Sequence, residues 1–362
     1  MTLTVLNVAY PFAPVGPDAV GGAEQVLTQI DAALVSSGHN SIIIACEGSR
    51  TAGRLLAVPR VEGTIGTAQM QAAHARHRAM IAAALRDWPI DVVHLHGADF
   101  TAYAPWGSAL ARSASQGSVP VLATLHLPSD AYFSNPFARD DIWINCVSQS
   151  QHARCPPYLR LLPPVENGVS ASFFDACFRK RDFVLMLTRV CPEKGIHLGI
   201  EAAKRAGAAL LIAGQVFPFD SHLRYFEQEV RPRLDRRRRF IGPAGTRRKR
   251  RLLASARALL VPSLTEETSS LVAREALASG TPVIAFARGA LTETVEHGRT
   301  GFLVHDENEM AKAIGPAAHL DPRECREAAQ ARFSLQHMVE GYFALYRRLR
   351  AHGRNAAMQG AA

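Results

Sequence analysis

The sequence lacks the signatures of several protein classes. None of its six cysteines forms a CxxC pair or shows metal-ligand spacing, so neither a zinc site nor a disulfide framework is indicated. No apolar run approaches membrane-spanning length, and the first β-rich run begins too near Met1 to follow a signal peptide. We therefore expect a cytoplasmic protein that is neither secreted nor inserted in a membrane.

The motifs of other nucleotide-using enzymes are also missing. The loop with Gly21 and Gly22 has neither the GxGxxG spacing of dinucleotide binders nor the GxxxxGK[ST] of a P-loop, so NAD and kinase chemistry are not supported. No DxD pair is present, and Asp140–Asp141 alone is thin support for a divalent ion. We expect no metal and no cofactor.

The length and composition of the chain indicate two domains. Its 362 residues, 48% hydrophobic and 20% charged, suit two soluble globular domains, each able to bury a core. Prolines, a glycine and mixed charge interrupt the pattern between Pro163 and Asp182. We therefore predict an N-terminal domain over residues 1–168, a C-terminal domain over 169–334, a terminal helix over 335–352 and a flexible tail over 353–362.

Short β-rich apolar runs alternate with longer helical stretches in both halves. Such alternation predicts doubly wound parallel sheets, whose ligands bind at the carboxyl ends of the strands. The predicted strands are Leu3–Tyr10, Ser41–Cys46, Asp91–His96, Pro120–His126, Ile144–Ser148, Phe183–Arg189, Ala208–Gly214, Phe240–Gly242, Ala258–Pro262 and Pro282–Ala287.

Four charged residues of the second half suit an anionic polyol ligand. Arg189 and Lys194, in the segment TRVCPEKG, could converge on one diphosphate. Glu267 precedes a helix with Ser269 or Ser270 as N-cap, and Glu275 lies on that helix, so the two carboxylates can grip hydroxyls. Taken singly, each charge is more simply a solvated surface residue.

Two longer strings carry a family resemblance. TRVCPEKG and PSLTEETSSLVAREALASGTPVIA are similar to the paired signatures of retaining nucleotide-sugar glycosyltransferases of the glycogen-synthase-like superfamily, the glycosyl transferases group 1. GGAE, HLHG, ENGV and GALTETVEHGRTGFLV support the likeness along most of the chain. The resemblance implies a GT-B fold, in which two Rossmann-like doubly wound parallel-sheet domains face each other across a cleft and the C-terminal helix packs back on the first domain.

The same resemblance implies roles for individual residues. Arg189 and Lys194 would bind the donor diphosphate, Glu275 the ribose and Glu267 the transferred sugar. His126, at the end of a predicted strand, would contact that sugar near the reacting centre. Further donor contacts are assigned to Gly21, Gly22, Gly214, Ser269, Ser270, Leu271 and Val272. Where the family usually carries Pro-Phe-Gly after the first glutamate, this chain has Thr-Ser-Ser, which leaves the identity of the donor open.

The activity implied is hexosyl transfer from a nucleoside diphosphate sugar to a hydroxyl acceptor with retained configuration. UDP is expected as the nucleotide part of the donor because it is frequent in the family. The acceptor is unknown. No covalent nucleophile stands out, so front-face attack without a metal is expected. A non-catalytic sugar-nucleotide binder and a phosphorylase are the alternatives on this fold.

A net charge of +9 invites a different class of partner. It is concentrated in Arg236–Arg239 and in Arg247–Arg251, which contains one lysine. We interpret these runs as solvated helix faces, with Leu252, Leu253 and Ala256 as the buried stripe. Contact with an anionic membrane surface is the main alternative, whereas RNA binding is a minor one because no stacking aromatics accompany the runs.

Overall fold

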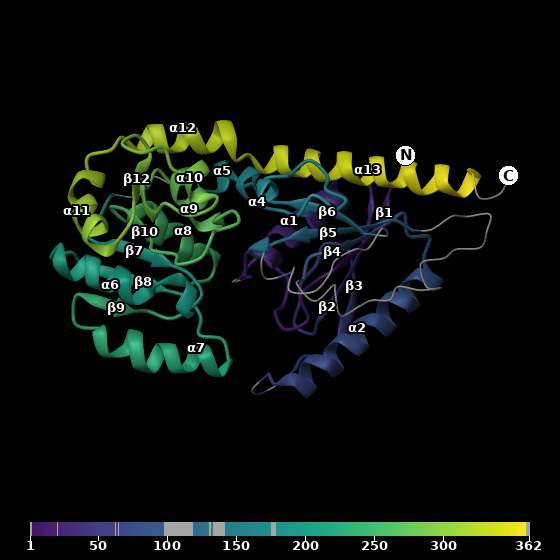
Figure 1. The fold of residues 1–362 in the computed structure, drawn as a ribbon, viewed down its shortest axis with the longest axis horizontal. Helices are drawn as coiled ribbons and strands as arrows, with labels where there is room; N and C mark the ends of the chain where they lie inside the picture. The colour runs from purple at the N-terminus through teal and green to yellow at the C-terminus, as the bar shows by residue number, and fades with distance from the viewer. Residues whose placement is uncertain are drawn as a thin grey trace. The chain divides into compact units, whose positions relative to one another are not determined.

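The computed structural model (Figure 1) describes residues 2–19, 21–61, 63, 65–97, 119–129, 132, 142–174 and 179–359, with side chains up to residue 353. Asp140 and Asp141 lie outside the described residues. The chain divides into two compact units. Unit 1 comprises Met1–Glu166 and Met338–Ala362, and unit 2 comprises Asn167–His337. The break follows Glu166, two residues before the predicted boundary.

Unit 1 is built on a six-stranded parallel sheet. Its strand order is β3-β2-β1-β4-β5-β6. Most of these strands are apolar runs buried along nearly their whole length, as expected for a parallel sheet with covered faces. The strands are β1 (Thr4–Val8), β2 (Asn40–Cys46), β3 (Arg54–Val58), β4 (Val92–Leu95), β5 (Val121–Leu125) and β6 (Ile142–Cys146).

The helices described in unit 1 include the C-terminal one. α1 (Gly22–Ser36), α2 (Thr67–Asp87) and α4 (Gln149–Ala153) come from the first stretch of chain, and α13 (Leu335–Gln359) returns most of its length to this unit. The Tyr346 hydroxyl lies 2.8 Å from Nδ1 of the buried His94, which ties α13 to β4. The helix runs on to Gln359, seven residues past the predicted helix end at residue 352.

Unit 2 repeats the architecture with the strand order β12-β11-β10-β7-β8-β9. Its strands are β7 (Val184–Leu187), β8 (Leu210–Ala213), β9 (Arg238–Phe240), β10 (Leu259–Val261), β11 (Val283–Phe286) and β12 (Gly301–Val304). Its longer helices are α6 (Ile196–Arg205), α8 (Thr246–Ser255), α9 (Leu271–Ala278), α11 (Glu307–Ala317) and α12 (Pro322–Arg332). Shorter helical segments are α5 (Ala171–Phe174), η3 (Pro192–Lys194), α7 (Asp220–Tyr225), η4 (Phe226–Val230), η5 (Arg231–Arg233) and α10 (Leu291–Thr294).

Two strand predictions need correction, and two further strands were missed. The predictions for β6 and β9 were placed about two residues too late, and β3 and β12 were not predicted at all. β3 is a half-exposed edge strand whose apolar run, Leu55–Val58, is only four residues long, too short to tell a strand from a helix by pattern. β12 begins with Gly301, a residue that strands disfavour, but a Cβ there would lie 1.9 Å from the Val283 carbonyl oxygen. Close approach of β11 therefore requires the glycine.

Both sheets have the strand order of a doubly wound fold, and in each the order reverses at one point. The reversal lies between β1 and β4 in unit 1 and between β7 and β10 in unit 2. Loops that leave the carboxyl ends of such neighbouring strands diverge and leave room for a ligand. The segment TRVCPEKG follows β7, and the loop with Glu267 follows β10, so both predicted signatures lie at this point of unit 2.

Candidate active site

The loops after β7 and β10 are held against each other by their backbones. The Leu264 N–H donates to the Glu193 carbonyl oxygen over 2.8 Å. Gly195 has a left-handed φ of +58°, and a Cβ there would lie 2.1 Å from the Pro262 carbonyl oxygen. Only glycine meets both conditions, so it fixes the place of the neighbouring Lys194.

Lys194 and Glu267 form a direct ion pair across these loops. Lys194 Nζ lies 2.5 Å from Glu267 Oε1, with side chains only 19% and 10% exposed. Burial by itself raises the pKa of the Glu267 carboxyl, but the Lys194 charge and hydrogen bonds from Lys194 and Ser263 lower it below its usual range. The carboxylate is therefore held ionised, as an acceptor for hydroxyl groups.

Arg189 lies beside this pair but has a different acidic neighbour. Its guanidinium is 3.9 Å from the Glu193 carboxylate, and both side chains are about one-third exposed. Its charge also helps to lower the pKa of Glu267. The two predicted diphosphate cations thus stand next to carboxylates, which keep them in place at the end of β7.

Glu275, on α9, contacts a residue that the sequence did not single out. Lys249 Nζ, from α8, lies 2.5 Å from Glu275 Oε1, and the side chains are 13% and 6% exposed. The interpretation of Arg247–Arg251 as a solvated face was therefore wrong for Lys249. A signal was available, because Lys249 lies four residues before the buried Leu253 and so on the same helix face.

The start of α9 has no side-chain cap. Ser270 occupies the predicted N-cap position, but its hydroxyl accepts no capping hydrogen bond, and its φ of 53° is left-handed. Ser269 is 3% exposed, and its Oγ has no hydrogen-bond partner among the described residues. Leu271 and Val272 form the first turn, where backbone N–H groups have no partner within the helix. These donors and the positive end of the helix dipole suit an anion.

Gly214 follows β8 at the same edge of the sheet. A Cβ there would lie 1.8 Å from the Thr188 carbonyl oxygen, and its N–H donates to Gly242 over 3.0 Å. The close approach of the chain after β7 therefore requires glycine at this position. This packing accounts for the residue whether or not a ligand lies beside it.

The predicted glycines of unit 1 lie at the start of α1. Gly21 is the N-cap, and Gly22 is the first helical residue. A Cβ at Gly21 would be 1.9 Å from Oε2 of the buried Glu24, so the carboxylate occupies the space that the missing side chain leaves. The GGAE motif thus places an acid against the backbone at this helix end.

His126 follows β5 and is half-buried in unit 1. Its Nε2 lies 3.3 Å from Nδ1 of His96, and the two rings are stacked with centroids 5.5 Å apart. Burial lowers the pKa of His126 to about 4, so the imidazole is neutral near pH 7. A neutral ring can exchange hydrogen bonds with a sugar hydroxyl.

The two units are doubly wound, and acids, bases and an uncapped helix lie at the switch point of unit 2. Comparison with protein families identifies the class of protein. Residues 181–318 match the model described as Glycosyl transferases group 1, and residues 20–176 match that of Glycosyltransferase Family 4. The chain belongs to the GT-B glycosyltransferases.

One curated relative matches most of the chain, and another matches a shorter part of it. A glycogen synthase of Mycobacterium tuberculosis (strain CDC 1551 / Oshkosh) is 27% identical over 91% of this chain and 89% of its own length. A D-inositol 3-phosphate glycosyltransferase of Nocardioides sp. is 42% identical, but the match covers only 33% of this chain and 27% of that relative.

Solved structures show the same fold at lower identity. Sucrose-phosphate synthase from Thermosynechococcus elongatus superposes with a TM-score of 0.78 at 22% identity, covering 97% of this chain and 100% of that one. Anabaena Alr3699/HepE in complex with UDP-glucose gives 0.73 at 18% identity, covering 96% and 100%. These likenesses confirm the predicted GT-B fold.

Proposed function

We propose that the protein is a retaining hexosyltransferase that moves a sugar from a nucleoside diphosphate donor, UDP-sugar by preference, to a hydroxyl acceptor. The observation that carries the proposal is the start of α9. There an uncapped helix end and a buried Ser269 hydroxyl without a described partner stand beside the Lys194–Glu267 and Lys249–Glu275 pairs. The UDP-glucose complex of the Anabaena protein supports the choice of donor.

The donor would be held by groups of opposite charge. Arg189, Lys194 and the N–H groups at Leu271 and Val272 would receive the diphosphate. Lys194 need not leave its carboxylate, because an ammonium has three N–H bonds and can bridge Glu267 and a phosphate oxygen. Charge and geometry are therefore in place before the donor arrives.

The two carboxylates would hold different sugars of the donor. Glu267, kept ionised by Lys194, would accept hydrogen bonds from the transferred hexose. Glu275, one turn into α9, would accept them from the ribose. Gly214, Ser269 and Ser270 are proposed to line the donor through their backbones. The donor contacts that the family resemblance implies for Gly21, Gly22 and His126, all in unit 1, stay predictions.

Transfer then breaks the bond between the anomeric carbon and the diphosphate oxygen, and the acceptor oxygen bonds to the same face of that carbon. The acceptor proton passes to the departing diphosphate. Negative charge that grows on the leaving oxygen is stabilised by Arg189, Lys194 and the α9 N-terminus. Fixed donors of this kind are each worth about 3–4 kcal/mol of barrier, so this step needs no metal.

A thermal-shift panel of UDP-, GDP- and ADP-sugars tests the donor. A ligand that binds only the folded protein stabilises it by RT ln(1 + [L]/Kd), so the responding compound identifies base and sugar together. Glu275→Ala should abolish the response, whereas Glu227→Ala should preserve it, because Glu227 is an exposed acid paired with Arg231. An unchanged shift in Glu275→Ala would contradict the role of this residue. A donor that binds without any turnover would favour a non-catalytic binder.

A second candidate property is attraction to an anionic membrane surface, where a lipid-linked acceptor would lie. Arg247, Arg248 and Arg251 are exposed on α8, and two of them crowd its first turn, where the helix dipole disfavours positive charge. Among the described residues, no helix is long and apolar enough to cross a bilayer. Flotation with phosphatidylserine vesicles at low and high salt tests this. Binding that persists when all three arginines become Gln would exclude α8 as the contact.

A further inference from the structure

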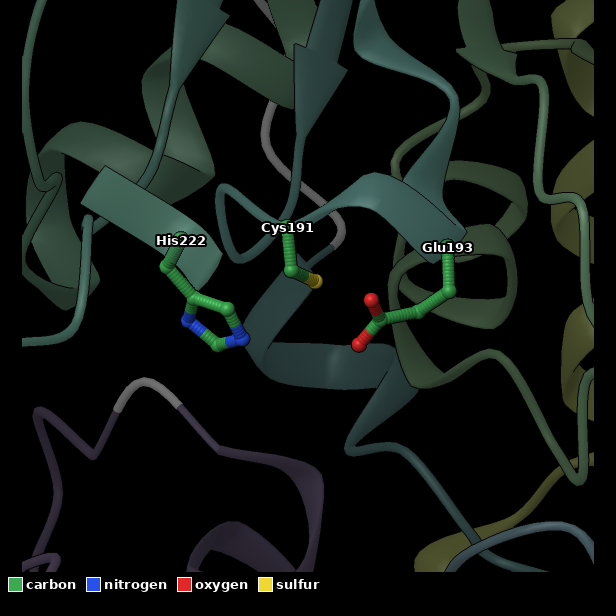
Figure 2. A group of neighbouring side chains, drawn as sticks. All are labelled: Cys191, Glu193 and His222. Carbon is green, nitrogen blue, oxygen red and sulfur yellow. The ribbon is translucent and has the colours of Figure 1, made fainter. Parts of the chain in front are cut away.

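Three side chains with different metal-binding atoms meet at the TRVCPEKG loop, two from the loop itself and one from α7. Cys191 directly precedes η3, Glu193 lies within it, and His222 comes from α7. The Cys191 Sγ, a Glu193 carboxylate oxygen and a His222 ring nitrogen all lie within 4.8 Å of one another. Figure 2 shows the polar ends of the three side chains facing a common space.

The set of donor atoms suits a borderline-soft divalent ion. Thiolate, imidazole and carboxylate are the ligands of Zn²⁺, at about 2.3 Å for sulfur and about 2.0–2.2 Å for nitrogen and oxygen. Ligand atoms within 4.8 Å of one another need only small side-chain adjustments to reach such distances. Three protein ligands leave the fourth tetrahedral position open.

We propose that Cys191, Glu193 and His222 form a binding site for one Zn²⁺-like ion. A hydrogen bond already joins the Cys191 thiol to the Glu193 carboxylate, so these two side chains meet without a metal, and it is the approach of His222 that remains to be explained. The Cys191 thiol has a long 3.8 Å contact with the Arg189 carbonyl oxygen. The buried Nδ1 of His222 has no hydrogen-bond partner among the described residues. Sequence spacing could not indicate the site, because His222 belongs to a separate helix.

Protonation of the ligands is compatible with binding. Burial lowers the pKa of His222, so its ring is neutral near pH 7 and offers a lone pair. Burial raises the pKa of the Cys191 thiol to about 12, so the ion must displace the thiol proton to solvent as the metal–sulfur bond forms. Affinity should therefore fall as the pH is lowered.

A bound ion should also tighten donor binding, an inference that rests on the proposed function. Glu193 faces Arg189 at 3.9 Å, and a metal-bound carboxylate would attract that guanidinium less. The ion adds two positive charges, and loss of the thiol proton leaves a net gain of one near Arg189 and Lys194. An anionic diphosphate should then bind more tightly, and by reciprocity it should tighten metal binding.

Metal binding is tested on the full chain after chelator treatment. Calorimetry should give one Zn²⁺ per chain, and Co²⁺ should show a thiolate-to-metal charge-transfer band. Cys191→Ser should abolish the band, and His222→Ala should weaken Zn²⁺ binding at least about tenfold, since loss of residues that merely support a ligand already costs that much.

Matched controls are the buried Cys325 and the exposed His319, both in unit 2. Cys325→Ser and His319→Ala should keep stoichiometry and affinity. Absence of an equimolar ion in the unsubstituted protein would overturn the proposal, and so would equal affinity in His222→Ala. His222→Ala keeps the test decisive if Cys191→Ser fails to fold.

Coupling to the donor is a separate measurement. UDP affinity with and without saturating Zn²⁺ should differ in the unsubstituted protein and be equal in His222→Ala. Zn²⁺ binding without binding of UDP, GDP or ADP would contradict the proposed function and leave the metal site standing. UDP binding that ignores bound Zn²⁺ would contradict only the coupling.

Discussion

The ammonium of Lys249 lies 2.5 Å from the carboxylate of Glu275, and this contact joins α8 to α9. Both side chains are nearly buried, so each charge depends on the other for compensation. Lys249 also lies 5.6 Å from the Phe174 ring centroid, which limits the room for water on that side. The acid assigned to the donor ribose is therefore held in place by a base from the neighbouring helix.

Removing that base should destabilise unit 2. Lys249→Met should cost about 3–5 kcal/mol, because it leaves the Glu275 charge buried without a partner. Adding Glu275→Gln should recover much of the loss. All tryptophans of the chain lie in unit 1, so hydrogen exchange of α9 amides is the suitable measurement. Arg248→Met, at an exposed neighbour, should change stability by no more than about 0.5 kcal/mol; a similar loss there would point to general disruption of α8.

Lys194→Gln should reduce turnover more than donor binding. If Lys194 stabilises charge that grows on the leaving diphosphate, kcat should fall about 10²–10³-fold while KM changes little. Steady-state kinetics with the donor found by the thermal-shift panel measure both constants. Lys204→Gln, at an exposed position on α6, is the control and should behave like the unsubstituted enzyme. A rise in KM with unchanged kcat would show that Lys194 binds the donor without assisting the reaction.

The sequence predicted the two-domain α/β fold, and comparison with solved structures confirms it. Parallel strands are continuous apolar runs, so β1, β5 and β7 could be found locally. Contacts between separate elements could not be found from local sequence. The Lys249–Glu275 pair depends on how α8 packs on α9, and in the sequence Lys249 is one cation among many. Edge strand β3 was missed for a different reason, because its apolar run, Leu55–Val58, is only four residues long.

The left-handed backbone at Ser270 also depends on context. Members of the resembling family usually carry glycine where this chain has Ser270. Only the φ of 53° shows what a glycine would provide there, which is ready access to the left-handed conformation. The roles of the site residues stay predictions, because placement at the carboxyl ends of β7 and β10 does not by itself show what they bind.

Unit 1 should lose stability as the pH falls from about 6.5. Burial lowers the pKa of His77 to about 4 and those of His94 and His96 well below 6.5. Below pH 6.5 these histidines are therefore protonated in the unfolded chain but stay neutral in the folded unit. Each such histidine removes about 1.4 kcal/mol per pH unit between 6.5 and its folded pKa. Urea unfolding followed by tryptophan fluorescence reports this unit. His77→Phe should reduce the slope of the unfolding free energy against pH by the contribution of one proton. A variant whose slope equals that of the unsubstituted protein would contradict the prediction.

Ser270 should accept glycine and reject branched residues. Its left-handed φ of 53° strains any residue with a Cβ, and most of all one that is branched there. Ser270→Val should destabilise unit 2 by about 1–3 kcal/mol. Ser270→Gly should lose nothing, since relief of strain offsets the greater freedom of glycine in the unfolded chain. Hydrogen exchange of the α9 amides beyond the first turn, which are hydrogen-bonded, measures both variants. Because the backbone N–H groups there are proposed to receive the diphosphate, Ser270→Gly should also keep donor affinity while Ser270→Val weakens it. Equal stability of the two variants would mean that this turn can relax out of the left-handed conformation, and the proposed anion site at α9 would then lose its fixed geometry.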